Sequence, residues 1–429
     1  MRALLIVRRD LSGNQKNPGM NVLVLNAGSN SLKFDVIAAR TEADALNEQR
    51  KLVSGAIENI GEEATFTLLD GKQVVRREKI DARDYGEATE AFLAWLNSAK
   101  QKGVPVTREF NAVGYRVVHG GETFDRPVVI GDGVVSDIIA LEDLAPLHNA
   151  AAMQVIETAQ HALGKSMPMV AVFDTVFHRT IPTRAAIYPL PLELSRKHGI
   201  RRYGFHGIAH EYLVRRYAKI EGQPLGHATV ITLHLESGCS ICAIKDGKSA
   251  DTSMGFTPLE GLMMGKRSGD IDPSIVGYLM RKEQANVDRV EKWLNNESGL
   301  LGVSGKSHDT RELMRLFDTD ERTRLALEIF CYRIRKYIGA YLAALGGCQA
   351  IIFGGGIGED TPFVRARVLQ DFGWFGLAVD PLLNEQTINR EGRITTDDSR
   401  LPAYVIPVEE GLLIAQQVAQ CLKAEKQDE

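Results

Sequence analysis

Two short apolar runs flank a polar turn near the start of the chain. Val22–Leu25 is continuous, as expected of a strand buried on both faces, whereas Leu32–Val36 alternates with period two. The turn between them, Asn26–Ser31, carries amides, hydroxyls and one glycine. The segment Thr229–Lys245 repeats this pattern and ends at the turn pair Asp246-Gly247. Two such hairpins, one in each half of the chain, suggest an internal duplication.

Helical periodicity dominates parts of the second half. Within Leu327–Leu345 apolar residues recur every three or four positions, and Gly346-Gly347 predicts the end of this helix. The apolar run Gln349–Phe353 predicts a short strand, followed by a glycine turn at 354–358. Glu410–Lys423 predicts an amphipathic helix at the C-terminus. Strands and helices that are mixed along the whole chain predict an α/β fold.

Length and composition narrow the class of protein. A chain of 429 residues is long enough for two domains. With 51 Lys+Arg against 55 Asp+Glu the net charge is −4, which gives no support for broad binding of nucleic acid or anionic membranes. Five scattered cysteines are too few for a disulfide framework and favour a reducing cytosol. Residues 1–19 lack the apolar core of a signal peptide, so we interpret them as an appendage outside the fold.

Several residues are suited to binding anions, although each also has a plainer structural interpretation. The Asn26–Ser31 turn, with Lys33 beside it, offers N–H groups and hydroxyls to phosphate oxygens, or is an ordinary hairpin turn. Arg116, between an apolar run and a glycine pair, is placed to clamp a carboxylate or phosphate, or to close a structural ion pair. Arg267 lies between Gly265 and Gly269 with the same two interpretations.

Three further features concern chemistry within the chain. Asp174 ends the apolar run Met169–Phe173, where a carboxylate serves catalysis or caps the next helix. His206 has glycines on both sides, which permits close approach of a substrate, although a single histidine is more often structural. Cys239-x-x-Cys242 lies in a predicted strand without a partner pair, which favours buried apolar thiols over a zinc or redox site. Two arginines, an aspartate, a histidine and phosphate-compatible turns together fit phosphoryl transfer.

Seven long motifs then extend the comparison to a known family. They are NAGSNSLKF, YRVVHGGE, LAPLHN, VFDTVFH, RRYGFHG, DTSMGFTPLEGLMMGKRSGDIDP and ESGLLGVSG. In this order they resemble the acetate kinase family, within the acetate and sugar kinase/Hsp70/actin superfamily. The resemblance implies two duplicated RNase H-like (actin-like ATPase) domains with an active-site cleft between them. It implies a first domain of residues 20–175 joined by a C-terminal helix at 408–429, and a second, nucleotide-binding domain of residues 176–407.

The resemblance also implies a reaction and a set of residues. The family converts ATP and acetate reversibly to ADP and acetyl phosphate by direct in-line transfer with Mg²⁺, for which Mn²⁺ can substitute. Matched by position, Asn26 and Glu410 serve the metal, Arg116 binds the acetate carboxylate, and Asp174, His206 and Arg267 are catalytic. The acetate pocket is Val118, Leu147, Phe205 and Pro258, and the nucleotide contacts are Lys33, His234, Leu235, Glu236, Ser237, Gly238, Asp309, Thr310, Arg311, Gly356, Ile357, Gly358, Glu359 and Asp360. The implied state is a cytosolic homodimer that binds neither nucleic acid nor membrane.

This chain departs from the family pattern on the nucleotide side. The family turn His-Leu-Gly-Asn-Gly is here His234–Gly238, with Glu236 and Ser237 at its centre, and Asp360 stands where the family usually has Asn. Together with Glu409, these changes place up to three extra carboxylates near the nucleotide phosphates. Lys266, which replaces a threonine of the family pattern, adds one positive charge. Alternatives are therefore a propionate or other short-chain acyl kinase, or a weakened nucleotide-binding paralogue with another phosphoryl donor. A sugar kinase is disfavoured because the pocket offers few partners for hydroxyls.

Overall fold

The structure, a computed structural model, describes residues 19–28, 30–41, 49–71, 73–101, 110–141 and 146–428. The chain forms two compact units, and each is described by itself. Unit 1 comprises the described residues up to Val176 together with those from Glu409 onwards, and unit 2 is Phe177–Val408. The predicted N-terminal appendage, apart from Gly19, lies outside the described residues.

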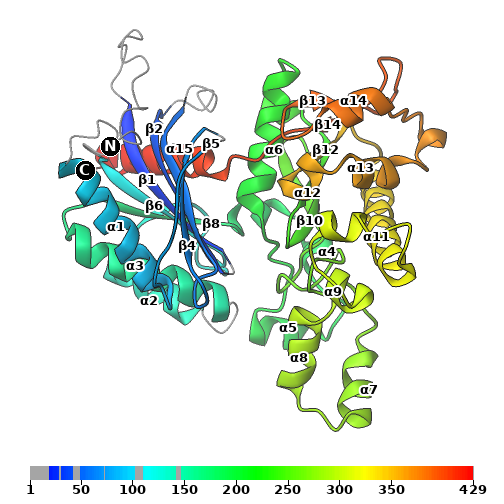
Figure 1. Ribbon diagram of the computed structural model, residues 1–429, viewed down its shortest axis with the longest axis horizontal. Helices are drawn as coiled ribbons and strands as arrows, with labels where there is room; N and C mark the ends of the chain where they lie inside the picture. The colour runs from blue at the N-terminus through cyan, green and yellow to red at the C-terminus, as the bar shows by residue number, and fades with distance from the viewer. Residues whose placement is uncertain are drawn as a thin grey trace. The chain divides into compact units, whose positions relative to one another are not determined.

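Unit 1 is built on an eight-stranded sheet in the order β5-β4-β3-β2-β1-β6-β8-β7 (Figure 1). Its strands are β1 (Met20–Ala27), β2 (Ser31–Ala39), β3 (Arg50–Glu58), β4 (Thr65–Asp70), β5 (Gln73–Lys79), β6 (Ala112–Val117), β7 (Val128–Val129) and β8 (Met169–Phe173). Its helices are α1 (Tyr85–Gln101), α2 (Asp132–Ala140), α3 (Pro146–Leu163) and α15 (Glu410–Asp428). Strands β1 to β5 pair antiparallel, whereas β6 pairs parallel with both β1 and β8.

The alternation of side chains along β1 assigns the two faces of this sheet to different helices. Leu23 belongs to a buried core that includes Phe92 of α1 and residues of α3. The C-terminal helix α15, red in Figure 1, packs on β1, β2, β6 and β8. Gly114 in β6 permits this close approach, because a Cβ at that position would lie 2.6 Å from Val418 and 3.8 Å from Val22. Val22, next to Leu23, therefore faces α15.

Unit 2 contains a six-stranded sheet in the order β11-β10-β9-β12-β14-β13 (Figure 1). Its strands are β9 (Val230–Leu235), β10 (Cys239–Lys245), β11 (Lys248–Thr252), β12 (Ala350–Gly354), β13 (Gly392–Arg393) and β14 (Ala403–Val405). Its α-helices are α4 (Thr183–Ala186), α5 (Leu192–His198), α6 (Gly207–Ile220), α7 (Ser274–Lys282), α8 (Val287–Asn296), α9 (Gly299–Ser304), α10 (Thr310–Met314), α11 (Glu321–Leu345), α12 (Gly355–Asp360), α13 (Pro362–Leu369) and α14 (Pro381–Gln386). Three 3-10 turns are η4 (Val176–Thr180), η5 (Leu225–His227) and η6 (Gly373–Phe375).

The two sheets share one topology. In each, the first three strands form an antiparallel meander in the order third-second-first, and two later strands extend the first strand in parallel. The hairpin at the start of each half, which the sequence predicts, forms the middle of this shared core, with its first strand at the centre. The predicted α/β fold with two duplicated actin-like domains is confirmed.

The helix predicted to end at Gly346 is confirmed, since this residue is the left-handed C-cap of α11 with φ of 74°. The glycine turn predicted after β12 is wrong, because these residues form α12. Gly355 takes φ of 74° at the start of that helix. The buried Arg365 donates hydrogen bonds to the carbonyls of Gly358 (2.8 Å) and Glu359 (3.1 Å), which satisfies carbonyls at the helix end. Tertiary contacts thus override the low helix propensity of glycine.

Candidate active site

Four of the residues predicted for the site meet at one edge of the sheet in unit 1. Asn26 and Arg116 are register partners in the parallel strands β1 and β6, and Asp174 directly follows β8. The carboxyl ends of parallel strands lie at one edge of a sheet, where α/β proteins place their binding groups. Glu410, the first residue of α15, reaches the same edge from the far end of the chain.

Hydrogen bonds join these four side chains into one network, here called the Arg116 network. Arg116 donates from Nε (3.0 Å) and Nη2 (2.5 Å) to Oδ2 of Asp174, whose side chain is fully buried. Its Nη1 donates to Oδ1 of Asn26 at 3.1 Å, and Nδ2 of Asn26 donates to Oε2 of Glu410 at 2.9 Å. The paired geometry is that of a guanidinium fork on a carboxylate, which fixes the plane of the arginine.

Three further residues of unit 1 are predicted to contact acetate or nucleotide, and the structure describes them in less detail. Val118 is buried directly after β6, and its role in an acetate pocket stays a prediction. Lys33 is an exposed residue of β2 opposite Asn26. Leu147 belongs to α3, but its side chain lies outside the described residues. Phe205 and Pro258 belong to unit 2, so the four-residue acetate pocket stays a prediction.

In unit 2, His206 and Arg267 both approach Gly238. A Cβ at Gly238 would lie in van der Waals contact with both side chains, 3.6 Å from Nε2 of His206 and 3.6 Å from Nη1 of Arg267. Nη1 of Arg267 also donates to the Pro258 carbonyl at 3.4 Å. Burial lowers the pKa of Arg267 below its usual value. Two nitrogen donors therefore converge beside a glycine, which permits close approach of a ligand.

The three segments predicted to contact nucleotide adjoin one another in unit 2. A Cβ at Gly265 would lie 3.3 Å from the carbonyls of both Ser237 and His308, which brings the β9–β10 turn close to the start of α10. A Cβ at Gly355 would lie 3.0 Å from Cγ of Glu236, which places the same turn against α12. The β9–β10 turn, the start of α10 and the start of α12 thus lie close together, as a shared role in nucleotide binding requires.

The three segments predicted to contact nucleotide also carry charged side chains. Asp309 caps α10 by accepting from the Arg311 amide at 2.8 Å, and its carboxylate pairs with the Arg311 guanidinium at 2.7 Å. Arg311 therefore lowers the pKa of Asp309. Burial raises the pKa of Glu359, and the neighbouring charge of Glu236 raises it further, although Val408 N–H donates to it at 3.0 Å. Glu236 and Glu359 are therefore close enough to repel each other.

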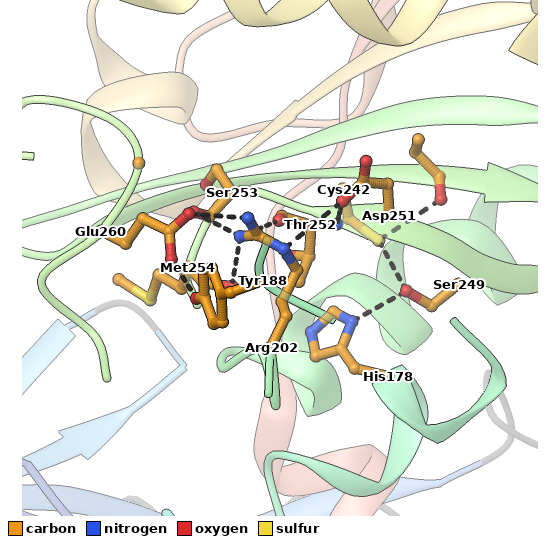
Figure 2. A network of polar contacts seen from close by, with 12 residues as sticks. His178, Tyr188, Arg202, Cys242, Ser249, Asp251, Thr252, Ser253, Met254 and Glu260 are labelled. Atoms are coloured by element: carbon orange, nitrogen blue, oxygen red, sulfur yellow. Dashed lines mark hydrogen bonds and ion pairs between the residues drawn. The ribbon is translucent and has the colours of Figure 1, made fainter. Parts of the chain in front are cut away.

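One residue that the sequence reasoning missed holds the loop leading to Arg267. Arg202 follows α5 and donates from Nη1 to the carbonyls of Thr252 (2.9 Å), Ser253 (3.2 Å) and Met254 (3.2 Å). Its Nη2 donates to Glu260 at 2.6 Å (Figure 2). Burial opposes its charge, but Glu260 raises the pKa of Arg202 above the usual value. A second arginine directly before Tyr203 in RRYGFHG was the available signal.

Arg202→Lys is expected to lower the free energy of unfolding by about 1–3 kcal/mol, because a lysine cannot reproduce the planar fork and leaves buried carbonyls unsatisfied. Chemical denaturation measures this change. Arg196→Lys is the matched control, since Arg196 pairs with Glu193 on the exposed surface of α5. Equal stability of both variants would show that Arg202 does not hold the loop.

Two features are absent from the part of the chain that the structure describes, a metal-binding cluster and a membrane-spanning helix. No group of three or more His, Cys, Asp or Glu side chains there is arranged to hold a metal ion by itself. No helix in the same part of the chain is long and apolar enough to span a membrane.

The duplicated fold and these clusters of anion-binding groups define the class of protein, a phosphotransferase with the actin-like ATPase fold. A sequence profile of the Acetokinase family matches residues 21–416. The acetate kinase of Chloroherpeton thalassium is 45% identical over 413 residues, which cover 94% of this chain and 99% of the relative. The chain therefore belongs to the acetokinase family, whose reaction is the ATP-dependent phosphorylation of acetate.

Solved structures agree with this membership. The crystal structure of Porphyromonas gingivalis acetate kinase matches with a TM-score of 0.84 and 36% identity, covering 94% of this chain and all of that one. A propionate kinase from Francisella tularensis matches with a TM-score of 0.83 and 37% identity, covering 93% and 98% of the two chains.

Proposed function

We propose that this chain transfers a phosphoryl group reversibly between ATP and acetate, giving ADP and acetyl phosphate, and that the predicted site residues carry the reaction. The observation that carries the assignment of the site is the Arg116 network. It joins four residues, matched independently to the family motifs, into one set of hydrogen bonds.

In this proposal Arg116 binds the acetate carboxylate. Acetate is already an anion at pH 7, so attack requires no strong base. The difficulty is to bring one anion against another. A guanidinium carries five N–H donors, enough to hold Asp174, Asn26 and a substrate carboxylate together. Asp174 fixes the plane of Arg116 and so orients the attacking oxygen.

His206 and Arg267 of unit 2 stabilise the transferring group. An acetate oxygen forms a bond to the γ-phosphorus while the bond from that phosphorus to the bridging oxygen of ATP breaks, and ADP leaves with the electron pair. Charge spreads over the three equatorial oxygens in this transition state. The N–H donors that converge beside Gly238 are suited to receive that charge, and their stabilising effect is largest where water is excluded.

The residues of the Arg116 network fit Mg²⁺. Its oxygen donors beside the Arg116–Asp174 pair, the Asn26 amide and the Glu410 carboxylate, are the hard ligands that Mg²⁺ prefers. A site with one or two carboxylates, completed by water and phosphate, is also the usual protein site for Mg²⁺. The chemistry that this ion would supply when bound is neutralisation of phosphate charge, and Mn²⁺ can substitute for it.

A hydroxamate assay for acyl phosphate tests the function. With ATP as donor, acetate is expected to be the best acceptor, followed by propionate and then butyrate. A preference for propionate would instead assign the activity named for the Francisella tularensis structure. No acyl phosphate with any acceptor or phosphoryl donor would overturn the proposal and favour a nucleotide-binding sensor.

The carboxylate of Glu236 is expected to weaken ATP binding. Two like charges about 4 Å apart repel by about 4 kcal/mol at an effective dielectric of 20, and about 1.4 kcal/mol already changes affinity tenfold. Replacing Glu236 and Ser237 by the family residues, Glu236→Gly/Ser237→Asn, should therefore lower the ATP KM about tenfold or more. Glu409, the third extra carboxylate, forms an ion pair with Lys51 in unit 1, which leaves Glu236 and Asp360 as the repelling groups.

Measuring the ATP KM at a series of free Mg²⁺ concentrations, in the wild type and in Glu236→Gly/Ser237→Asn, distinguishes the possible roles of Glu236. Recruitment of an additional Mg²⁺ by Glu236 would appear as a steeper dependence in the wild type only. Pairing of Glu236 with Lys266 predicts ordinary ATP kinetics and a less stable Lys266→Thr variant. Unchanged KM and unchanged magnesium dependence would show that Glu236 does not face the phosphates.

We propose a cytosolic homodimer. All five cysteines are free, in keeping with a reducing compartment. Leu190, Leu192 and Leu194, at and beside the start of α5, expose apolar side chains that are suited to burial against a partner. Size-exclusion chromatography with light scattering would measure the mass, and a monomer at micromolar concentration would contradict the dimer.

A further inference from the structure

His206 is held in a backbone conformation that few residues adopt. It is the N-cap of α6, with φ of 58° and ψ of 25°, in the left-handed region that favours glycine. The residue before it is fixed by a buried histidine, because Nε2 of His178 lies 3.0 Å from the carbonyl of Phe205. A carbonyl only accepts, so His178 carries its proton on Nε2 and accepts from the Ser249 hydroxyl, 2.8 Å from Nδ1 (Figure 2).

The ring of His206 begins a chain of three hydrogen bonds that leads into the buried interior of unit 2, here called the histidine relay. Nδ1 of His206 lies 2.9 Å from Oγ of Ser240, and the same oxygen lies 2.8 Å from Nε2 of His210. Nδ1 of His210 lies 2.7 Å from Oγ1 of Thr232. Ser240, His210 and Thr232 are all fully buried. Since His210 follows His206 by four residues on α6, both rings lie on one face of that helix.

The relay has a preferred direction. Within the described part of the chain, the Thr232 hydroxyl has no hydrogen-bond partner other than His210, and a buried O–H donor without an acceptor is costly. Thr232 therefore donates to Nδ1 of His210, which places the His210 proton on Nε2, facing Ser240. Oγ of Ser240 accepts a hydrogen bond from this N–H group, and the Ser240 hydroxyl donates a hydrogen bond to Nδ1 of His206. His206 is left with its proton on Nε2, the nitrogen beside Gly238 and Arg267.

The charged and titratable groups around the relay agree with neutral rings. The His234 ring lies 4.7 Å from His206, and the His178 ring lies 5.8 Å from His210. The Arg267 guanidinium also lies near His206, since both approach the same point beside Gly238, and its positive charge disfavours an imidazolium. Burial lowers the pKa of His210 well below its usual value and that of His178 to about 4.

We propose that Thr232, Ser240 and His210 are positioning residues, which fix His206 as a neutral imidazole with its proton on Nε2. In this form Nε2–H is a hydrogen-bond donor aimed at the space beside Gly238. The inference rests on the proposed function, because a phosphoryl oxygen is the acceptor that makes this donor useful in catalysis. Fixing a tautomer through hydrogen bonds to the other ring nitrogen is how proteins prepare histidine for chemistry.

The tautomer is measured directly by ¹⁵N NMR of histidine-labelled protein. The wild type is expected to show a protonated Nε2 and an unprotonated Nδ1 for His206. Thr232→Val preserves shape but removes the first donor, and Ser240→Ala breaks the chain at its centre, so both should give mixed tautomers. Thr232→Ser restores the hydroxyl and should restore the wild-type spectrum. A wild-type His206 with its proton on Nδ1 would overturn the proposal.

Kinetics supply the second measurement. Ser240→Ala should lower kcat about 10- to 100-fold, while the KM values for acetate and for ATP stay within about threefold of the wild type. This magnitude is taken from metal-binding histidines, which lose about as much activity when the residue that orients them is removed. Ser399→Ala is the matched control, because it also removes a buried serine hydroxyl of unit 2, one that accepts from the Ala378 amide and donates to the Leu401 carbonyl instead of bonding a histidine. The control is expected to retain kcat and the His206 spectrum. An equal loss in both serine variants would mean general damage to packing and would overturn the positioning role.

The two proposals fail separately. A wild-type protein without acyl phosphate formation would refute the proposed function, while the NMR measurement would still report the tautomer of His206. Full acyl phosphate formation with unchanged kcat and spectra in Ser240→Ala and Thr232→Val would refute the relay alone.

Discussion

Arg116→Ala is expected to lower kcat/KM for acetate by about 30-fold to several thousand-fold, the equivalent of about 2–5 kcal/mol. Truncation of Arg116 removes the charged partner of the substrate. It also leaves the fully buried Asp174 carboxylate without its guanidinium, so the melting temperature should fall as well. Steady-state kinetics with varied acetate, together with thermal denaturation, measures both effects.

Arg83→Ala is the control for this experiment. Arg83 also pairs with a carboxylate of unit 1, that of Glu87, but the pair lies on the exposed surface. The control should leave both the kinetics and the melting temperature unchanged. If Arg116→Ala retained the wild-type KM and kcat for acetate, the assignment of Arg116 to the substrate would be wrong.

Asp174→Asn is expected to lower kcat by about 10²-fold or more, as misplacement of a substrate-orienting group does, while the fold stays intact. The substitution keeps the shape of the side chain and removes its charge. The amide of this variant would offer Arg116 one oxygen instead of two, so the plane of the guanidinium would no longer be fixed. Single-turnover kinetics measures the chemical step, and circular dichroism checks the fold.

Asp35→Asn is the control, because Asp35 is also a mostly buried carboxylate of this sheet in an ion pair, with Lys51 at 3.4 Å. Wild-type kcat in Asp174→Asn would refute phosphoryl transfer at this site. Loss of activity together with a large fall in melting temperature would instead support a role in capping the η4 turn that follows.

Periodicity in the sequence was sufficient to predict the elements whose burial follows from local pattern. The strands around Asn26 and Gly238 and the end of α11 at Gly346 are of this kind. Helix α12 could not be predicted, because its stability comes from Arg365 and not from its glycine-rich sequence. Family motifs supplied the residues of the Arg116 network, but the bonds between them follow only from strand order.

The partners of His206 were missed for a related reason. Thr232 and Ser240 lie on strands whose register is set by the fold, so their hydroxyls carry no sequence signal of their own. The spacing of His206 and His210 on one helix was a usable signal, because residues four apart share a face. A pairing that depends on long-range contacts leaves no periodic trace in the sequence.

The return of α15 to unit 1 has a consequence for biosynthesis. Unit 2 is continuous, so its whole chain is available once Val408 has left the ribosome. Unit 1 begins at the N-terminus, yet the face of its sheet around Gly114 is covered by Ile414 and Val418. Domains usually fold in the order of their synthesis, and contacts across almost the whole chain form slowly. The N-terminal unit must therefore wait, with an apolar sheet face uncovered, until the last residues of the chain have been translated.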